Sequence, residues 1–258
     1  MDAEDGTVPL DETFTETIEH YGRSYQHYSL TNGTYFAPID EDEISRLEVM
    51  HGVLSRLFDG RLIFPPIRSP RRILDCGCGP GDWAIEVATQ YPDAEVSFPY
   101  AIGKSPLQGA IFVGHPSQAK FDTPCSIIEL EASGSYHALS QWSRQYLESQ
   151  QPYKDPRAPL QLASWMRSAG FTEVESRLLT LPMCGWSSVP RDYDIGRSNT
   201  DNVNQLLYSL ALYPFTQFLG MSFSDFQLLI AQARSEASNP AFKAYFPVYV
   251  CIGRKPRR

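Results

Sequence analysis

Apolar residues recur along this chain at two spacings, and each spacing predicts a type of element. After Asp40, which can cap a helix, apolar residues continue at helical spacing until Gly60, a typical helix terminator. Residues 71–76 then form a short apolar run before a glycine-rich loop. A helical pattern follows at 82–91 and a second apolar run at 94–98. Strand, loop, helix and strand in this order predict the start of a parallel βαβ unit.

The pattern is weaker near the N-terminus and in the middle of the chain. Residues 14–28 are rich in aromatic side chains and are predicted to be partly helical, whereas the proline- and glycine-rich residues 99–124 predict no regular element. Pro247 is expected near the start of its strand or at a sheet edge. The other predicted strands are 126–131, 171–181 and 244–255. Helices are predicted at 136–149, 158–169, 201–218 and 223–237, the third perturbed at Pro214 and the last capped by Ser222 or Ser224.

The length of 258 residues allows one α/β domain with a substantial core, or two small ones. Residues 1–12 are expected to form a disordered tail, because they are acidic and lack apolar periodicity. Residues 13–258 are then expected to form a single domain. It would consist of a helical N-terminal lid at 13–70 and an α/β core at 71–258 that is degenerate at 97–125.

Charge and composition argue against several classes of function. The net charge of −8 disfavours binding to nucleic acid, which requires a cationic surface. No run of 18 uncharged apolar residues occurs, and the acidic N-terminus does not look like a secretory signal. We therefore expect no membrane segment and a cytoplasmic location, with the basic residues 254–258 leaving the nucleus as an alternative. Five irregularly spaced cysteines predict neither a disulfide framework nor a metal site.

The most informative segment is the heptad Asp75-Cys76-Gly77-Cys78-Gly79-Pro80-Gly81 between the first predicted strand and its helix. Glycine permits positive φ and has no Cβ, so the backbone can pass close beneath a ligand, and the first amides of the helix can face an anionic group. The acidic residue Asp75, two places before the first glycine, can hold the cationic methionine end of S-adenosylmethionine (AdoMet). The Gly-Lys-Ser/Thr of a phosphate loop is absent, and the spacing is wrong for a dinucleotide. A tight turn without a ligand is the alternative interpretation.

Other segments extend the pattern beyond the loop. The run from Ile73 to Val96 is the longest of them. The shorter ones are 21–28, 40–43, Arg46-Leu47, His51, 59–62, Gly185-Trp186, Ile195-Gly196, Asn202 and 253–256. Together they resemble the LaeA-like AdoMet-dependent methyltransferases of fungal secondary metabolism. The resemblance covers residues 14–96 and 126–256.

The resemblance implies an α/β fold with a Rossmann-like class I methyltransferase sheet and N-terminal helices. The family's sheet has seven strands in the order 3-2-1-4-5-7-6, with the ligand at the carboxyl ends of the strands. Here only 29 residues separate Val96 from Ser126, where the family's fifth strand would begin. Each crossover unit takes ~30 residues, so about two βα units are missing and the sheet is expected to be reduced in strand number.

The resemblance also implies a defect in the cofactor site. In the family, an acid at the end of the second strand binds the ribose hydroxyls of AdoMet. Here Val96 is followed by Ser97-Phe98-Pro99-Tyr100, with no acid before Asp122. We therefore expect AdoMet to bind poorly, with complete loss of the cofactor as the alternative. Either the chain is a shortened, divergent member, or its sequence reflects an altered or mispredicted transcript.

The remaining candidates each have a structural alternative. Tyr21 and Arg23 could belong to a lid over the cofactor, with Arg23 pairing with the AdoMet carboxylate, or could pack a surface element onto the core. His27 or His137 could be a general base, or a structural histidine. No catalytic residue is assigned. The aromatic residues that could line a pocket for a flat aromatic substrate, or form core, are Tyr208, Tyr213, Phe215, Phe218, Phe223 and Phe226.

Two functions follow. The first is an AdoMet-dependent methyltransferase of a fungal secondary-metabolite pathway, acting on an oxygen or nitrogen of a small molecule. The second is a catalytically impaired methyltransferase homologue that steers a pathway intermediate or acts through partner proteins as a regulator. The family resemblance favours the first, and the missing segment favours the second.

Overall fold

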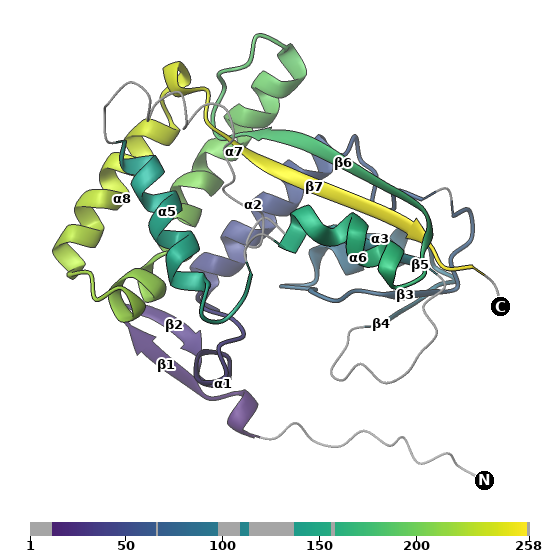
Figure 1. Cartoon of the computed structure of the whole chain (residues 1–258), viewed down its shortest axis with the longest axis horizontal. Coiled ribbons are helices and arrows are strands. Elements are labelled where there is room, and N and C mark those ends of the chain that lie inside the picture. The colour runs from purple at the N-terminus through teal and green to yellow at the C-terminus, as the bar shows by residue number, and fades with distance from the viewer. Residues whose placement is uncertain (1–11, 66, 98–108, 114–136, 156–157, 257–258) are drawn as a thin grey trace.

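The computed structural model describes residues 12–65, 67–97, 109–113, 137–155 and 158–256. These residues form an α/β arrangement in which a group of helices lies beside three small sheets (Figure 1). The strand predicted at 126–131 lies outside the described residues.

The N-terminal segment is a hairpin, not the partly helical element predicted for 14–28. Strands β1 (Thr17–His20) and β2 (Arg23–Gln26) pair antiparallel, between a short 3₁₀ turn η1 (Glu12–Phe14) and the helix α1 (His27–Thr31). Tyr21 and Gly22 form the connection with φ of 48° and 75°. Positive φ at both central residues matches the twist of a two-residue hairpin. The aromatic residues of this segment had favoured a helical prediction, so the turn was missed.

Helix α2 (Glu41–Leu57) confirms the prediction made from Asp40. The Asp40 carboxylate accepts a hydrogen bond from the amide of Glu43 at 3.0 Å. At the other end, Gly60 has φ of 71° and its amide donates to the carbonyl of Ser55 at 2.8 Å. Such a bond satisfies a carbonyl that the last helical turn would leave without a partner.

The predicted βαβ unit is confirmed. Strands β3 (Arg72–Leu74) and β4 (Glu95–Ser97) pair in parallel and are joined by α3 (Asp82–Gln90). Two contacts hold this unit to the preceding segment. His51 of α2 lies 2.7 Å from the Glu86 carboxylate, and the Trp83 indole donates to the carbonyl of Leu62 at 3.1 Å.

The late helices agree with the sequence pattern at α8 and differ at α7. Helix α8 (Phe223–Ala237) is capped by Ser222, whose hydroxyl accepts from the amide of Asp225 at 3.1 Å. Helix α7 (Pro190–Ser209) starts well before the predicted position 201 and ends before 218, and a separate π-helix η3 (Pro214–Phe218) follows it. Before Val203, the buried face of α7 has one large apolar residue, Ile195, beside Gly196, Asn199 and Asn202, so the sequence shows no apolar stripe there.

Two of the remaining helical segments lie close to their predicted ranges. They are α5 (Ala138–Gln150) and α6 (Leu162–Ser168), which is preceded by η2 (Ala158–Gln161). The short η4 (Pro240–Phe242) was not predicted. Across the part of the chain that is described, no helix combines the length and apolarity needed to cross a bilayer.

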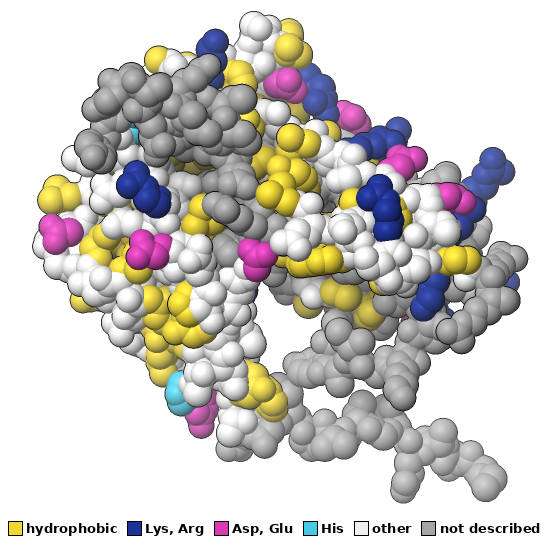
Figure 2. All heavy atoms as spheres, viewed as in Figure 1, with side chains coloured by type: hydrophobic (Ala, Val, Ile, Leu, Met, Phe, Trp, Pro, Cys, Tyr) yellow, Lys and Arg dark blue, Asp and Glu magenta, His cyan; other side chains and the backbone are white. Residues whose placement is uncertain are grey.

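The third sheet has the order β5-β7-β6 and is antiparallel throughout. It consists of β5 (Gly109–Val113), β6 (Thr172–Pro182) and β7 (Tyr245–Arg254). Strand β5 falls inside 99–124, where no element was predicted. It reaches only the end of β7, so Pro247 has a strand neighbour on one side, Thr180 of β6, as a strand proline requires. Figure 2 shows side chains of both charges along the outer side of β6, where Arg177 pairs with Glu175 at 3.2 Å.

The core lies between the helices and one face of β6 and β7. Leu181, Phe246, Val248 and Val250 supply the sheet side. On the helical side, the Trp142 indole donates to the carbonyl of Leu207 at 2.8 Å. Two members of the predicted aromatic series, Phe215 and Phe226, are fully buried there, so at these two positions core packing is the correct interpretation. In the described residues β3–β4 and β5-β7-β6 are separate sheets.

Candidate cofactor-binding site

The glycine loop connects the carboxyl end of β3 to α3 and is shaped by local hydrogen bonds. The amide of Asp75 donates to the carbonyl of Ser97 at 3.0 Å, which extends the parallel pairing by one residue. One oxygen of the Asp75 carboxylate accepts from the amide of Gly77 at 3.0 Å, and the amide of Gly81 donates to the carbonyl of Cys78 at 2.9 Å. The loop therefore holds its own shape and leaves its outer surface open.

Two of the three glycines are required by the backbone. Gly79 has φ of 51° and Gly81 has φ of 102°, and the second value in particular is poorly accessible to residues with a side chain. Gly77 has no positive φ, and a Cβ there or at Gly79 would meet no atom within 4 Å. The fold of the described residues therefore gives no reason for glycine at 77. A bare backbone at this position is what the close approach of a ligand would require.

Helix α3 presents free amides to the same space. Its N-cap is Gly81, and no side chain caps it; the first intrahelical bond runs from the amide of Ile85 to the carbonyl of Gly81 at 2.9 Å. The amides of residues 82–84 then have no helical partner, and the helix dipole favours an anion near them. A carboxylate group of a bound molecule would be stabilised there.

Asp75 and Cys76 supply the acidic group and one of the thiols of the loop. The second carboxylate oxygen of Asp75 has no hydrogen-bond partner among the described residues, and the side chain is half-buried. Partial burial, together with the charge of Asp75, raises the pKa of the Cys76 thiol above its ordinary value. A raised pKa makes this thiol a weaker nucleophile than an ordinary cysteine.

The ribose side of the expected site has no acid in the described residues. Strand β4 ends at Ser97, which is level with Leu74 of β3. The only carboxylate on β4 belongs to Glu95, which lies at the opposite end of the strand, level with Arg72. The described residues thus fit the methionine end of AdoMet and offer nothing to its ribose hydroxyls.

Tyr21 and Arg23, the two other predicted cofactor residues, belong to the β1–β2 hairpin, which lies apart from β3 and α3 (Figure 1). The Arg23 guanidinium donates twice to the Asp40 carboxylate, at 2.6 and 2.7 Å, and once to the hydroxyl of Ser209 at 3.0 Å. Tyr21 stacks on the ring of Phe223 with 4.2 Å between centroids. The described structure does not bring these two residues together with Asp75, Gly77, Gly79 and Gly81.

The pairing of Arg23 with Asp40 dominates the local electrostatics. Burial alone would raise the pKa of Asp40, but the Arg23 guanidinium and the amides of Glu43 and Ser24 outweigh it and hold that pKa below its usual range. Asp40 therefore caps α2 and anchors the hairpin as a carboxylate. The two candidate bases also pair with acids: His27 lies 3.0 Å from Glu16, and His137 lies 3.6 Å from Glu236.

A buried ionic network is the feature that sequence reasoning missed. Arg46 donates to both carboxylate oxygens of Glu43, at 2.9 and 2.7 Å, and each side chain is only 1% exposed. Its third bond reaches Asn202 at 2.9 Å. Asn202 donates to Asn199 at 2.7 Å, and Asn199 donates to the carbonyl of Pro182 at 2.8 Å. The network joins α2, α7 and the end of β6, and the Glu-x-x-Arg spacing was its one signal in the sequence.

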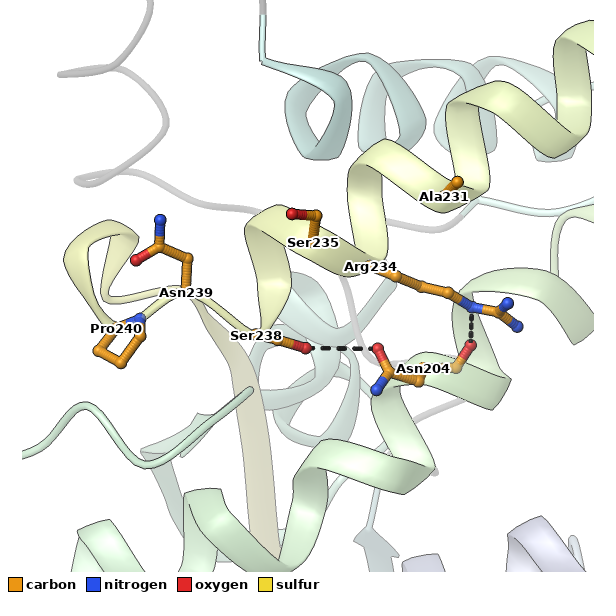
Figure 3. A pocket seen from close by; sticks show the side chains of 7 residues that line it. All are labelled: Asn204, Ala231, Arg234, Ser235, Ser238, Asn239 and Pro240. Atoms are coloured by element: carbon orange, nitrogen blue, oxygen red, sulfur yellow. Dashed lines mark hydrogen bonds between the residues drawn. The ribbon is translucent and has the colours of Figure 1, made fainter.

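Of the hollows on the described surface, two are well defined by their lining residues, and neither is lined by a residue of the glycine loop. The larger, of about 760 Å³, lies between α7 and the end of α8 (Figure 3). Arg234 crosses it and donates to the carbonyl of Asn204 at 2.6 Å, with its guanidinium 5.7 Å from the ring of Tyr208. The smaller, of about 440 Å³, lies where α2 ends and α7 begins. Neither adjoins the loop as a methyl-acceptor pocket would.

Comparison with known proteins gives a consistent set of relatives, although no family model and no solved structure matches the chain significantly. It is 27% identical to the "Secondary metabolism regulator laeA" of Monascus pilosus, over 92% of this chain and 78% of that protein. It is 25% identical to the protein of that name in Aspergillus fumigatus, over 97% and 82%. It is 27% identical to the "Protein-methionine methyltransferase laeA" of Emericella nidulans, over 93% and 77%.

The alignments also bear on the missing segment. They extend over 292 to 313 positions, although the whole chain has 258 residues. The relatives therefore carry residues inside the matched region that this chain lacks. This agrees with the internal deletion inferred from the short interval after Val96.

Proposed function

Because this chain belongs to the LaeA-like family, we propose that it is a methyltransferase-like regulator of fungal secondary metabolism that uses its glycine loop to bind the methionine end of AdoMet. The observation that carries the proposal is the loop itself, open to solvent at the carboxyl end of β3 and bare at Gly77 and Gly79. The regulatory part rests on the names of the relatives. Those names favour a regulator over an enzyme that modifies a pathway intermediate.

Each part of the loop has a role in this proposal. The free oxygen of the Asp75 carboxylate accepts a hydrogen bond from the cationic amino group of the ligand, and the amides at the start of α3 face its carboxylate. Gly77 and Gly79 let the ligand lie against the backbone. When bound, AdoMet supplies an activated methyl group on its sulfonium sulfur. The two parallel strands that bear the loop would belong to a Rossmann-like sheet reduced in strand number.

A methyl acceptor that carries no proton needs no general base, and neither of the two histidines considered as bases belongs to the loop. A hydroxyl or amine must lose a proton when it is methylated, whereas a thioether sulfur carries none. The two candidate histidines pair with carboxylates elsewhere in the described structure. We therefore propose a methionine side chain of a protein as the acceptor, which agrees with the name of the Emericella nidulans relative. Neither of the two hollows described above is lined by a residue of the glycine loop.

We expect weak AdoMet binding that depends on Gly79. Loss of two hydrogen bonds to a ribose-binding carboxylate lowers affinity by about 10²–10⁴-fold relative to a site that has them. Isothermal titration up to millimolar AdoMet should still detect binding, and Gly79→Val should remove it because the new side chain would enter the ligand space. Gly220→Val is the matched control, since Gly220 also has positive φ, 64°, and open space around it. If Gly79→Val and Gly220→Val bound AdoMet equally well, the glycine loop would not be the binding site. If the wild-type chain bound no AdoMet, the protein would have to act as a regulator without the cofactor.

The Asp75 carboxylate can be tested without disturbing the turn. Asp75→Asn keeps an oxygen that can accept from the Gly77 amide but removes the charge. We expect about tenfold weaker binding of both AdoMet and S-adenosylhomocysteine, because both carry the same amino group and lose one charge-assisted bond. The melting temperature should change little. Unchanged affinity for both ligands would show that the carboxylate only shapes the turn.

A further inference from the structure

The segment that leads into β3 is an exposed, irregular stretch with a serine at its centre. Arg68, Ser69, Arg71 and Arg72 are all exposed, and the strand begins only at Arg72. The hydroxyl of Ser69 has no hydrogen-bond partner among the described residues. It is therefore accessible to an enzyme that must fit a short extended segment into its active site.

The residues after Ser69 form a recognisable chemical pattern. Pro70 follows it directly, and Arg72 stands three places after it. Proline has no amide hydrogen and a fixed φ, so a kinase site that leaves no acceptor for that hydrogen selects proline at this place. Many proline-directed protein kinases also recognise a basic residue three places after the serine, which they bind with acidic groups of their own.

This pattern occurs once in the sequence. Serine or threonine precedes proline at three places, Ser69, Ser105 and Thr123, but only Ser69 has a basic residue three places on. The other two lie outside the described residues. They nevertheless provide internal comparisons, because they carry the proline without the cation.

The surroundings of Ser69 favour a phosphate once it is attached. Arg68, Arg71 and Arg72 have no ion-pair partner in the described part of the chain. Glu95 is level with Arg72 across the β3–β4 pair, but no ion pair joins them. All three guanidinium groups belong to residues within three positions of Ser69, so a phosphate dianion on Ser69 can form one to three charge-assisted hydrogen bonds with them.

We propose that Ser69 is a phosphorylation site for a proline-directed protein kinase. The Ser69 oxygen attacks the γ-phosphorus of ATP, so that a bond forms between them while the bond from that phosphorus to the ADP oxygen breaks. The hydroxyl proton passes to a base of the kinase. The product is phosphoserine flanked by Arg68, Arg71 and Arg72, a local charge change from about +3 to about +1.

This site is separate from the glycine loop. Ser69 precedes β3, and the loop follows it, so the strand of three residues stands between them, about 10 Å at 3.3 Å per residue. Phosphorylation is thus expected to leave AdoMet binding unchanged and to stabilise the segment that enters the strand. The inference does not depend on the proposed transferase role.

The full chain would be incubated with a cyclin-dependent kinase and ATP, and phosphate would be located by peptide mass spectrometry. We expect Ser69 to carry most of it, and Ser69→Ala to remove that fraction. Pro70→Ala and Arg72→Gln keep the hydroxyl and should each lower kcat/KM at least about tenfold, since each removes one element of recognition. Arg61→Gln, which changes an exposed arginine outside the pattern, should have no effect.

Two results would overturn the assignment. One is that Ser105 or Thr123 is phosphorylated more than Ser69 in the wild-type chain. The other is that Arg72→Gln and Arg61→Gln are phosphorylated at the same rate, which would mean that the basic residue is not read. Because Pro70→Ala and Arg72→Gln retain the acceptor at an exposed position, a loss of phosphorylation in them reports recognition. Circular dichroism would confirm that they are folded.

Discussion

Replacing Arg46 with methionine is expected to destabilise the fold by about 3–5 kcal/mol. The substitution leaves the Glu43 carboxylate without its two hydrogen-bond donors, at a site where both side chains are only 1% exposed. It also removes the donor to Asn202, which links α2 to α7. An uncompensated buried charge is costly because the low-dielectric surroundings cannot replace the solvation that water gives it.

Urea denaturation followed by circular dichroism would measure this effect. Replacing both partners, Glu43→Leu with Arg46→Met, should recover much of the loss, because no charge then remains buried. The exposed pair of Arg191 with Asp59, 2.8 Å apart, is the control, and Arg191→Met should cost less than about 1 kcal/mol. The buried network would have no special role if Arg46→Met cost no more than Arg191→Met.

Gly196→Ala is expected to destabilise the chain by about 2–4 kcal/mol, although alanine is the better helix former. Gly196 lies on the buried face of α7, where a Cβ would come within 2.1 Å of the carbonyl oxygen of Cys184 and 2.8 Å of Pro182. The obstacle is backbone, which cannot rotate away as a side chain can. The helix would have to move off the segment after β6, disturbing the neighbouring bond from Asn199 to Pro182.

Gly52→Ala is expected to change the stability in the opposite direction to Gly196→Ala. Gly52 is in the middle of α2 and is exposed, and a methyl group added there would meet no atom within 4 Å. Alanine at this position should therefore stabilise the chain by about 0.5–1 kcal/mol. Thermal denaturation of the two variants would separate the effect of alanine's helix propensity from the effect of close packing at Gly196. If both variants shifted the melting temperature upward, the close approach of α7 to Cys184 would be wrong.

What could be foreseen from the sequence was local. The cap at Asp40, the βαβ unit around the glycine loop and the start of α8 at Ser222 each depend on residues a few positions apart. The hairpin at Tyr21-Gly22 was missed because a two-residue turn competes with helical spacing over a short window. Strand β5 was missed because its pairing partner, β7, lies far along the chain and supplies most of the reason for it to be a strand.

The same division applies to the candidate site. The loop from Asp75 to Gly81 could be identified because its chemistry is contiguous. The environment of Arg23 could not be predicted, because its partner Ser209 is 186 residues away. The local sequence does not distinguish an arginine that binds a cofactor from one that forms a structural ion pair. The Glu43–Arg46 pair has the spacing of an ordinary surface pair on a helix. Only the packing of α7 over it makes it a buried one.

The hairpin has a consequence for how the protein emerges during synthesis. Its anchors on the late helices, Arg23 to Ser209 and His20 to Thr216, span 186 and 196 residues. At 5–20 residues per second, the ribosome needs roughly 10–40 s to deliver those partners after the hairpin itself has left the exit tunnel. Throughout that interval Tyr25 of β2, which is fully buried in the folded chain, lacks its late partner Tyr213. The nascent chain is therefore expected to need chaperone protection at its beginning rather than at its end.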